Sequence, residues 1–213
     1  MTISPEWTTI DDLDALTELI GVPLPRTRDK ARPALLPVDR DWLAASPFCV
    51  LATTGPDGAD ASPKGDPAGQ LVHVIDDRTI AIAERPGNRR ADGYRNILRD
   101  PHVGLLSLIP GRGDTLRING RARLVRDAPF FDEMIVKGHR PVLAIVIEID
   151  EVFHHCSKAF LRSQLWDPAT WDPEGLVPRR AVVAQLCERP DDPIEELDAY
   201  YDEREYVTGL YAG

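Results

Sequence analysis

The hexapeptide Arg85-Pro86-Gly87-Asn88-Arg89-Arg90 combines three guanidinium groups and one amide around a Pro-Gly turn. It follows the apolar run 79–83, which has the composition of a short strand, and precedes residues 91–98, whose spacing is compatible with a helix. Planar guanidinium groups match the oxygens of a phosphate dianion. We therefore interpret the segment as a phosphate clamp, although such a hexapeptide taken alone is also typical of a solvated basic turn.

A second polar motif is Ser62-Pro63-Lys64-Gly65-Asp66-Pro67, which places a hydroxyl, an ammonium and a carboxylate close together. It ends a segment that should pair with a strand over 48–53. Taken alone, the motif is also typical of a loop. We interpret the carboxylates of Asp60, Asp66 and Asp114 as loop carboxylates.

A third motif covers residues 110–122 and alternates polar with apolar residues. On a strand, Thr115, Arg117, Asn119 and Arg121 share one face, while the other face is apolar. Such a polar stripe is either part of a binding site or the solvated outer face of a barrel.

Other kinds of site find little support in the sequence. His154, His155 and Cys156 have metal-ligand side chains, but consecutive residues of a strand point to opposite faces, so we expect no metal site. The three cysteines are too few and too scattered for a disulfide framework. No Ser/His/Asp array or pair of carboxylates favours hydrolysis.

Composition limits the class of protein. The 213 residues carry a net charge of −10, which argues against a general binder of nucleic acid or of anionic membranes. No apolar run approaches the roughly 20 residues of a membrane span, and no leader-like segment is recognisable. We therefore expect a cytoplasmic protein with neither nucleic acid nor membrane as a partner.

The elements indicate a mainly β fold with flanking helices (α+β). We expect an N-terminal helix and extended arm over 1–41, a barrel domain over 42–166 and an acidic helical tail over 167–213. The helix should cover 8–20, and short helices should cover 89–98 and 129–136. Six strands at short spacing favour a closed antiparallel barrel. These strands are expected at 48–53, 69–75, 79–83, 103–109, 115–125 and 142–149.

The three motifs occur in the order SPKGD, RPGNRR and LRINGRA, each tied to a different strand. This combination resembles the FMN-binding split barrel of the pyridoxamine 5'-phosphate oxidase superfamily, most closely its bacterial branch with SPKGD, RPGNRR and LRxNGRA signatures. The resemblance covers about Trp42 to Trp166. It implies a six-stranded antiparallel split barrel that binds FMN at a homodimer interface.

The resemblance also implies roles for individual residues. The phosphate-facing positions are Lys64, Asn88, Arg89 and Arg90. The main chain at Ile82, Ala83 and Glu84 and the side chain of Thr115 fall where family members contact the flavin ring. Weaker candidates for the same cofactor are Ser62, Arg117 and Asn119. Positions that would reach the flavin of the other subunit are Lys158, Arg162 and Trp166, for which packing of a structural helix on the barrel is an equal alternative.

The function implied is that of an FMN-dependent oxidoreductase acting on a small molecule that the sequence does not identify. Two alternatives stay open: a flavin-binding or sensing module without catalysis, and a deazaflavin-dependent reductase. The Arg-x-His substrate signature of the true oxidase is not found near the C-terminus. We therefore do not expect oxidation of vitamin B6.

Overall fold

The computed structural model describes residues 7–56, 58–172, 175 and 177–211, and the chain divides into two compact units, Met1–Ala31 and Arg32–Gly213. The first unit contains α1 (Leu13–Ile20) and the one-turn helix α2 (Pro25–Arg28). Asp12 caps α1 by accepting a hydrogen bond from the amide of Ala15 at 2.7 Å. The expected N-terminal helix forms over 13–20 but not over 8–12, and α2 interrupts the expected extended arm, because a proline favours the first position of a helix.

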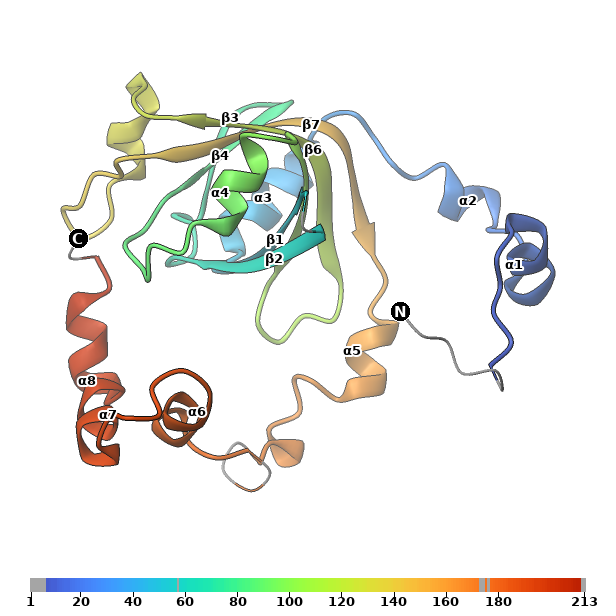
Figure 1. Ribbon diagram of the computed structural model, residues 1–213. Helices are drawn as coiled ribbons and strands as arrows, with labels where there is room; N and C mark the ends of the chain where they lie inside the picture. The colour runs from blue at the N-terminus through green and yellow to red at the C-terminus, as the bar shows by residue number, and fades with distance from the viewer. Residues whose placement is uncertain (1–6, 57, 173–174, 176, 212–213) are drawn as a thin grey trace. The chain divides into compact units, whose positions relative to one another are not determined.

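The second unit is built on one antiparallel sheet, which Figure 1 shows as a strongly curved wall. The strand order is β2-β1-β5-β6-β7-β4-β3. The strands are β1 (Phe48–Gly55), β2 (Gly58–Gly65), β3 (Val72–Asp76), β4 (Thr79–Ala83), β5 (His102–Leu108), β6 (Thr115–Val125) and β7 (Ala144–His155).

The mainly β fold with flanking helices is confirmed, but the prediction of six strands is wrong, because the sheet has seven. The additional strand is β2, whose Ala, Asp, Ser, Pro and Lys residues lack the apolar alternation of a strand. It forms through its hairpin with β1, in register from Gly55↔Gly58 to Phe48↔Gly65. Pro63 is tolerated there because β2 lies at the edge of the sheet.

The short spacing of the strands led us to expect a closed barrel, but hydrogen bonds do not close it. Within the described part of the chain, no strand pairing joins the two edge strands β2 and β3. The wall is therefore split.

The core fills the concave side of the sheet and is completed by two helices. These are α3 (Pro37–Ala45), which contributes Trp42 and Leu43, and α4 (Asp92–Ile97), which contributes Ile97. A smaller apolar cluster around Phe131, from the 3₁₀ helix Pro129–Met134, packs against Ala81 and Ala83. Strand β4 is thus buried on both faces, which accounts for its uninterrupted apolar sequence.

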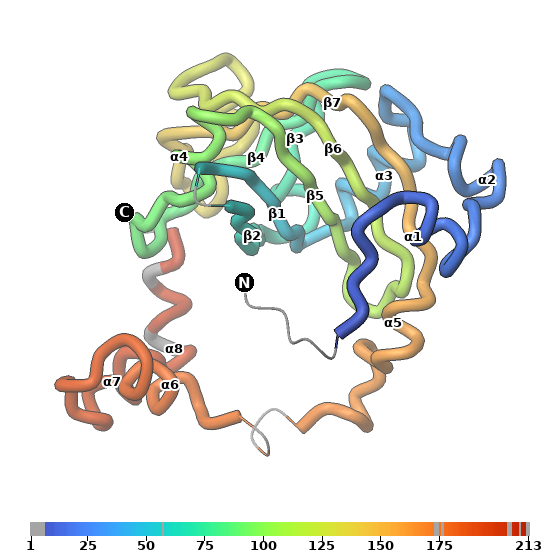
Figure 2. The backbone as a smooth tube through the Cα atoms, turned by 45° about the vertical axis from the view of Figure 1, so that its right-hand side comes forward, coloured from blue at the N-terminus to red at the C-terminus, as the bar shows by residue number. Residues whose placement is uncertain are grey.

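The remaining helices follow β7. They are α5 (Lys158–Ser163), the 3₁₀ helix Pro168–Thr170, α6 (Arg180–Cys187), α7 (Ile194–Tyr200), α8 (Glu203–Tyr206) and the 3₁₀ helix Val207–Gly209. Figure 2 follows this part of the backbone from orange to red. Leu197 of the acidic segment is fully buried, so this part of the tail packs an apolar side chain. None of the helices described has the length and apolar character that a bilayer crossing requires.

Candidate functional site

The SPKGD motif places two polar side chains toward the inside of the barrel wall. In the hairpin, Ser62 lies opposite Leu51 and Lys64 lies opposite Cys49. Directly opposed residues of an antiparallel pair share one face. Because Leu51 and Cys49 are fully buried, Ser62 and Lys64 lie on the core-facing side of β2, where both are half-buried.

Lys64 is held by neutral groups. Its ammonium donates to the hydroxyl of Ser62 at 2.8 Å and lies 3.5 Å from the carbonyl oxygen of Pro63. The Tyr94 ring of α4 has its centre 5.9 Å from the same nitrogen. Burial lowers the pKa of Lys64, and no carboxylate of a described residue forms an ion pair with it. A half-buried cation without such a partner is typical of an anion-binding position.

Helix α4 closes over this side of β2. Gly93 lies so close that an added Cβ would be 3.8 Å from the Ser62 hydroxyl oxygen. The amide of Asn96 donates to the hydroxyl of Thr53 at 3.1 Å and ties the helix to β1. Burial raises the pKa of Tyr94 to about 12, so this phenol stays protonated at neutral pH.

The RPGNRR loop runs from the end of β4 to the start of α4 and has an unusual backbone. Arg89 and Ala91 have φ values of 61° and 58°, in the left-handed region that residues with a side chain rarely adopt. The side-chain oxygen of Asn88 accepts a hydrogen bond from the amide of Arg90 at 3.0 Å. The guanidinium of Arg90 pairs with Asp92, while Arg89 is exposed and forms no ion pair with a described residue.

Asp60 of β2 acts electrostatically on one residue of each motif. The hydrogen bond with Asp92 is the main cause that raises the pKa of Arg90, and the carboxylate of Asp60 adds to this effect. Burial lowers the pKa of Lys64, and the same carboxylate opposes this lowering. Asp60 lies within β2, so our interpretation of this residue as a loop carboxylate is wrong. The direct contact between the SPKGD and RPGNRR motifs is the ion pair of Asp66 with Arg85 at 2.8 Å, and the phosphate clamp itself stays a prediction.

The ring-facing candidates on β4 lie next to this cluster in the chain. Ile82 and Ala83 are buried and pair with Ile145 and Ala144 of β7. The pairing of β4 with β3 ends at Val72↔Ile82, so β3 does not cover that edge of Ala83. Glu84 continues along β7, because its amide donates to the carbonyl of Leu143 at 2.8 Å.

The candidates on β6 occupy a different face. Thr115 is buried, whereas Arg117 and Asn119 lie half-buried on the outer side of the wall. There Arg117 donates to the side-chain oxygen of Asn119 at 3.2 Å, and Asn119 donates to Glu151 at 2.5 Å. Within one chain, these two side chains therefore do not join Ser62 and Lys64.

The outer face is hollowed beside Asn119. A shallow cavity of about 300 Å³ is lined there mainly by residues of β1, β5 and β6, with one residue each from β2 and β7. The surface is hollow here because Ala52 and Gly104, which lie in one row with Asn119 across the three strands, have a methyl group and no side chain.

The candidates on and after α5 separate into two kinds. Lys158 and Arg162 are exposed, whereas Trp166 stacks on Phe160, with ring centres 5.9 Å apart. The indole of Trp166 also donates to the carbonyl of Arg112 at 2.7 Å. Trp166 therefore has a packing role within one chain, which was one of the two alternatives for this segment.

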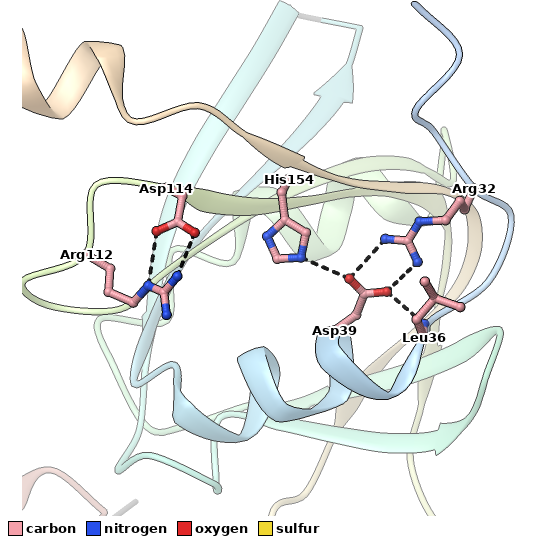
Figure 3. Close-up of polar contacts among 6 residues, drawn as sticks. All are labelled: Arg32, Leu36, Asp39, Arg112, Asp114 and His154. Atoms are coloured by element: carbon pink, nitrogen blue, oxygen red, sulfur yellow. Dashed lines mark hydrogen bonds and ion pairs between the residues drawn. The ribbon is translucent and has the colours of Figure 1, made fainter. Parts of the chain in front are cut away.

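A further polar cluster, shown in Figure 3, surrounds Asp39 at the start of α3. The buried carboxylate accepts two hydrogen bonds from Arg32, at 2.6 and 3.0 Å, and one from the amide of Leu36 at 2.7 Å. The ring nitrogen Nε2 of His154 lies 3.1 Å from it. Arg112 and Asp114 form an ion pair nearby (Figure 3). These contacts anchor α3, and among the described residues no group of three or more His, Cys, Asp or Glu side chains is arranged to hold a metal.

Sequence reasoning missed two kinds of residue. Tyr94 packs on Lys64 from a helix whose inner face the motif did not reveal. We interpreted Asp66 as a loop carboxylate and included Arg85 in the phosphate clamp, whereas the structure pairs the two in a buried ion pair at 2.8 Å. The sequence did contain a signal for this pair, because the carboxylate of Asp66 ends SPKGD and the guanidinium of Arg85 begins RPGNRR.

Comparison with known proteins agrees with this architecture. The family model of pyridoxamine 5'-phosphate oxidase matches residues 36–156, which is more than half of the chain. The chain therefore belongs to the pyridoxamine 5'-phosphate oxidase family. No curated protein matches it significantly.

Several solved structures are similar to part of this chain at low sequence identity. HupZ of Group A Streptococcus is 15% identical with a TM-score of 0.46, covering 56% of this chain and 93% of its own. A candidate pyridoxamine 5'-phosphate oxidase of Lactobacillus delbrueckii is 22% identical with a TM-score of 0.45, covering 57% and 95%. General Stress Protein 26 of Bacillus anthracis is 16% identical with a TM-score of 0.43, covering 54% and 88%.

Proposed function

We propose that this chain is an FMN-binding flavoprotein that acts as an oxidoreductase on a small molecule. The observation that carries the proposal is the surroundings of Lys64. This half-buried ammonium contacts a hydroxyl and a carbonyl but forms no ion pair with a described carboxylate, and it lies 5.9 Å from the ring centre of Tyr94 in α4, the helix that follows the RPGNRR loop. A phosphate dianion would satisfy these donors, because charge-assisted hydrogen bonds are strong where water is partly excluded.

The residues present fit the phosphate end of FMN. Lys64 and Ser62 offer an ammonium and a hydroxyl from the inner face of β2, and Asn88, Arg89 and Arg90 offer an amide and two guanidinium groups from the loop. Asp60 and Asp92 already balance part of this charge, which keeps the site selective for a small anion rather than for a polyanion.

We further propose that the protein acts as a homodimer with the cofactor at the interface. Arg117 and Asn119 lie on the outer face of the wall, beside the shallow cavity, and cannot meet Lys64 in the same chain. A second copy packed on this face would bring the two sets together. Lys158 and Arg162 of the partner subunit are exposed cations with the chemistry to contact the cofactor.

When bound, FMN would supply the hydride-transfer chemistry, and the chain's own residues would do the rest. Lys64, Arg89 and Arg90 would hold the phosphate, and the buried main chain of Ile82 and Ala83 would offer a dry surface for the ring. Arg117 would place a positive charge near the ring, reduced by Glu151 at 3.5 Å.

The direct test is an absorption spectrum of the purified chain, followed by mass spectrometry of the small molecule released on denaturation. FMN in the extract, or binding of added FMN, supports the proposal. A bound deazaflavin, or failure to bind FMN either from the cell or when it is added, contradicts it. Oxidation of a nicotinamide donor in the steady state would then distinguish an oxidoreductase from a flavin-binding module without catalysis.

A further inference from the structure

A buried ion pair joins the two motifs of the proposed phosphate site. The Nε of Arg85 donates to Oδ2 of Asp66 at 2.8 Å, and the side chains are only 14% and 2% exposed. Arg85 also donates to the main-chain carbonyl of Met134 at 3.0 Å. The guanidinium is therefore fixed by two acceptors, and the carboxylate is almost completely removed from water.

The pair bridges the split in the barrel wall. Asp66 directly follows β2, at one edge of the sheet, and Arg85 follows β4, which lies next to the opposite edge. No strand pairing within the described residues connects these two ends of the sheet. The ion pair thus makes a link there that the backbone does not make.

The pair is also close in sequence to the proposed phosphate ligands. Asp66 is two residues beyond Lys64, and Arg85 is three residues before Asn88. A residue spans at most about 3.5 Å of chain, so each member of the pair lies within about 10 Å of these ligands along the chain. A movement of the pair therefore shifts the backbone that carries them.

A third group completes this arrangement from the C-terminal segment. The hydroxyl of Tyr211 donates to Oδ1 of Asp66 at 2.8 Å, so both oxygens of the carboxylate are engaged. The Tyr211 ring has Arg85 5.8 Å and Lys137 5.3 Å from its centre. The tail of the chain, red in Figure 2, is thereby tied to the motifs near its end.

We propose that Asp66 and Arg85, with Tyr211 as the supporting third member, are positioning residues that set the distance between Lys64 and the loop 88–90. They would thereby determine the preference of the site for a phosphorylated flavin over riboflavin. This inference rests on the proposed function. A phosphate gains from Lys64 and the arginines only when both lie within hydrogen-bond reach at once, whereas the isoalloxazine ring does not depend on that distance.

The test compares dissociation constants for FMN and riboflavin, measured by flavin fluorescence on the flavin-free full chain. The variants are Asp66→Asn, which keeps the shape of the side chain but removes its charge, Arg85→Lys and Tyr211→Phe. The matched control is Asp198→Asn in α7, which breaks the exposed ion pair of Asp198 with Arg179. Thermal unfolding of each flavin-free variant measures stability separately.

We expect the wild type to prefer FMN, and Asp66→Asn and Arg85→Lys to lower this preference about tenfold with little change for riboflavin. Tyr211→Phe, which removes one hydrogen bond, should lower it about threefold, and the control should retain it. A merely structural role would lower stability with the FMN preference unchanged, or weaken the binding of both flavins equally, and either result would overturn the inference. If Asp66→Asn does not fold, Arg85→Lys and Tyr211→Phe decide by the same criteria.

Failure of the inference is distinguishable from failure of the proposed function. A wild type that shows no preference for FMN overturns the phosphate clamp, and the inference with it. A wild type that prefers FMN, with variants that keep the full preference, overturns the inference alone.

Discussion

Asp39→Asn is expected to destabilise the protein by about 3 kcal/mol, because this carboxylate organises the start of α3. Asp39 is fully buried and accepts hydrogen bonds from Arg32 and from the amide of Leu36 (Figure 3). Breaking a buried ion pair costs about 3–5 kcal/mol when the remaining charge is left without a partner. The Arg32 side chain is 28% exposed and can gain water, which places the estimate at the lower end of that range.

The effect should depend on pH in a defined direction. Burial acts to raise the pKa of Asp39, but the hydrogen bonds from Arg32 and Leu36 outweigh it and hold the pKa below the ordinary value of 3.8. A carboxyl group whose pKa is lowered by folding stabilises the protein above its unfolded-state pKa, and this contribution is lost as the pH falls through the folded-state pKa. The difference in the free energy of unfolding between wild type and Asp39→Asn should therefore be complete at about pH 6 and should shrink below about pH 4.

Urea unfolding followed by circular dichroism at several pH values measures this difference. The matched control is Asp41→Asn, an exposed residue of the same helix, which should change the free energy of unfolding by less than about 0.5 kcal/mol. Equal stability of the two variants at neutral pH would refute the reasoning, as would a difference that stays constant down to acid pH.

Three further outcomes are expected. In the native chain, Cys49 should resist alkylation at pH 8, because burial raises the pKa of its thiol to about 12, while the two exposed cysteines react; labelling of all three cysteines would contradict this. Gly120→Ala should destabilise strongly, by about 2–5 kcal/mol, because an added Cβ would lie 2.1 Å from the carbonyl oxygen of Glu148, whereas Gly87→Ala has room and should melt like the wild type. Arg117→Met should lower the reduction potential of bound FMN in a dye-equilibration titration by removing a positive charge near the ring, and an unchanged potential would place that charge elsewhere.

Local sequence patterns predicted most of the barrel. The run 79–83 and the alternation over 115–122 have the composition and period of strands, and both form strands. The expected pairing of the segment before SPKGD with the strand over 48–53 is confirmed, but we did not count β2 among the six strands, because its residues are small or polar. Its existence depends on tertiary context, which a hydrophobic period does not contain.

The candidate site was predictable in its residue types but less so in its geometry. The joint occurrence of the SPKGD and RPGNRR motifs indicated that they lie together, and the Asp66–Arg85 ion pair joins them. The sequence did not predict that Arg117 and Lys64 are separated, because their separation depends on which face of the curved sheet each side chain occupies. The buried pair Asp66–Arg85 was missed because carboxylates in Pro- and Gly-rich segments are ordinarily solvated.

The most direct test of the account is the affinity of the flavin-free chain for FMN and riboflavin, in the wild type and in Arg89→Ala/Arg90→Ala. Each phosphate hydrogen bond from a guanidinium contributes about 1.5 kcal/mol at the low end of its range, so two predict a loss of about a hundredfold in FMN affinity. Riboflavin, which lacks the phosphate, should bind both proteins equally. Unchanged binding of FMN to the double variant would contradict the assignment of the phosphate to this loop.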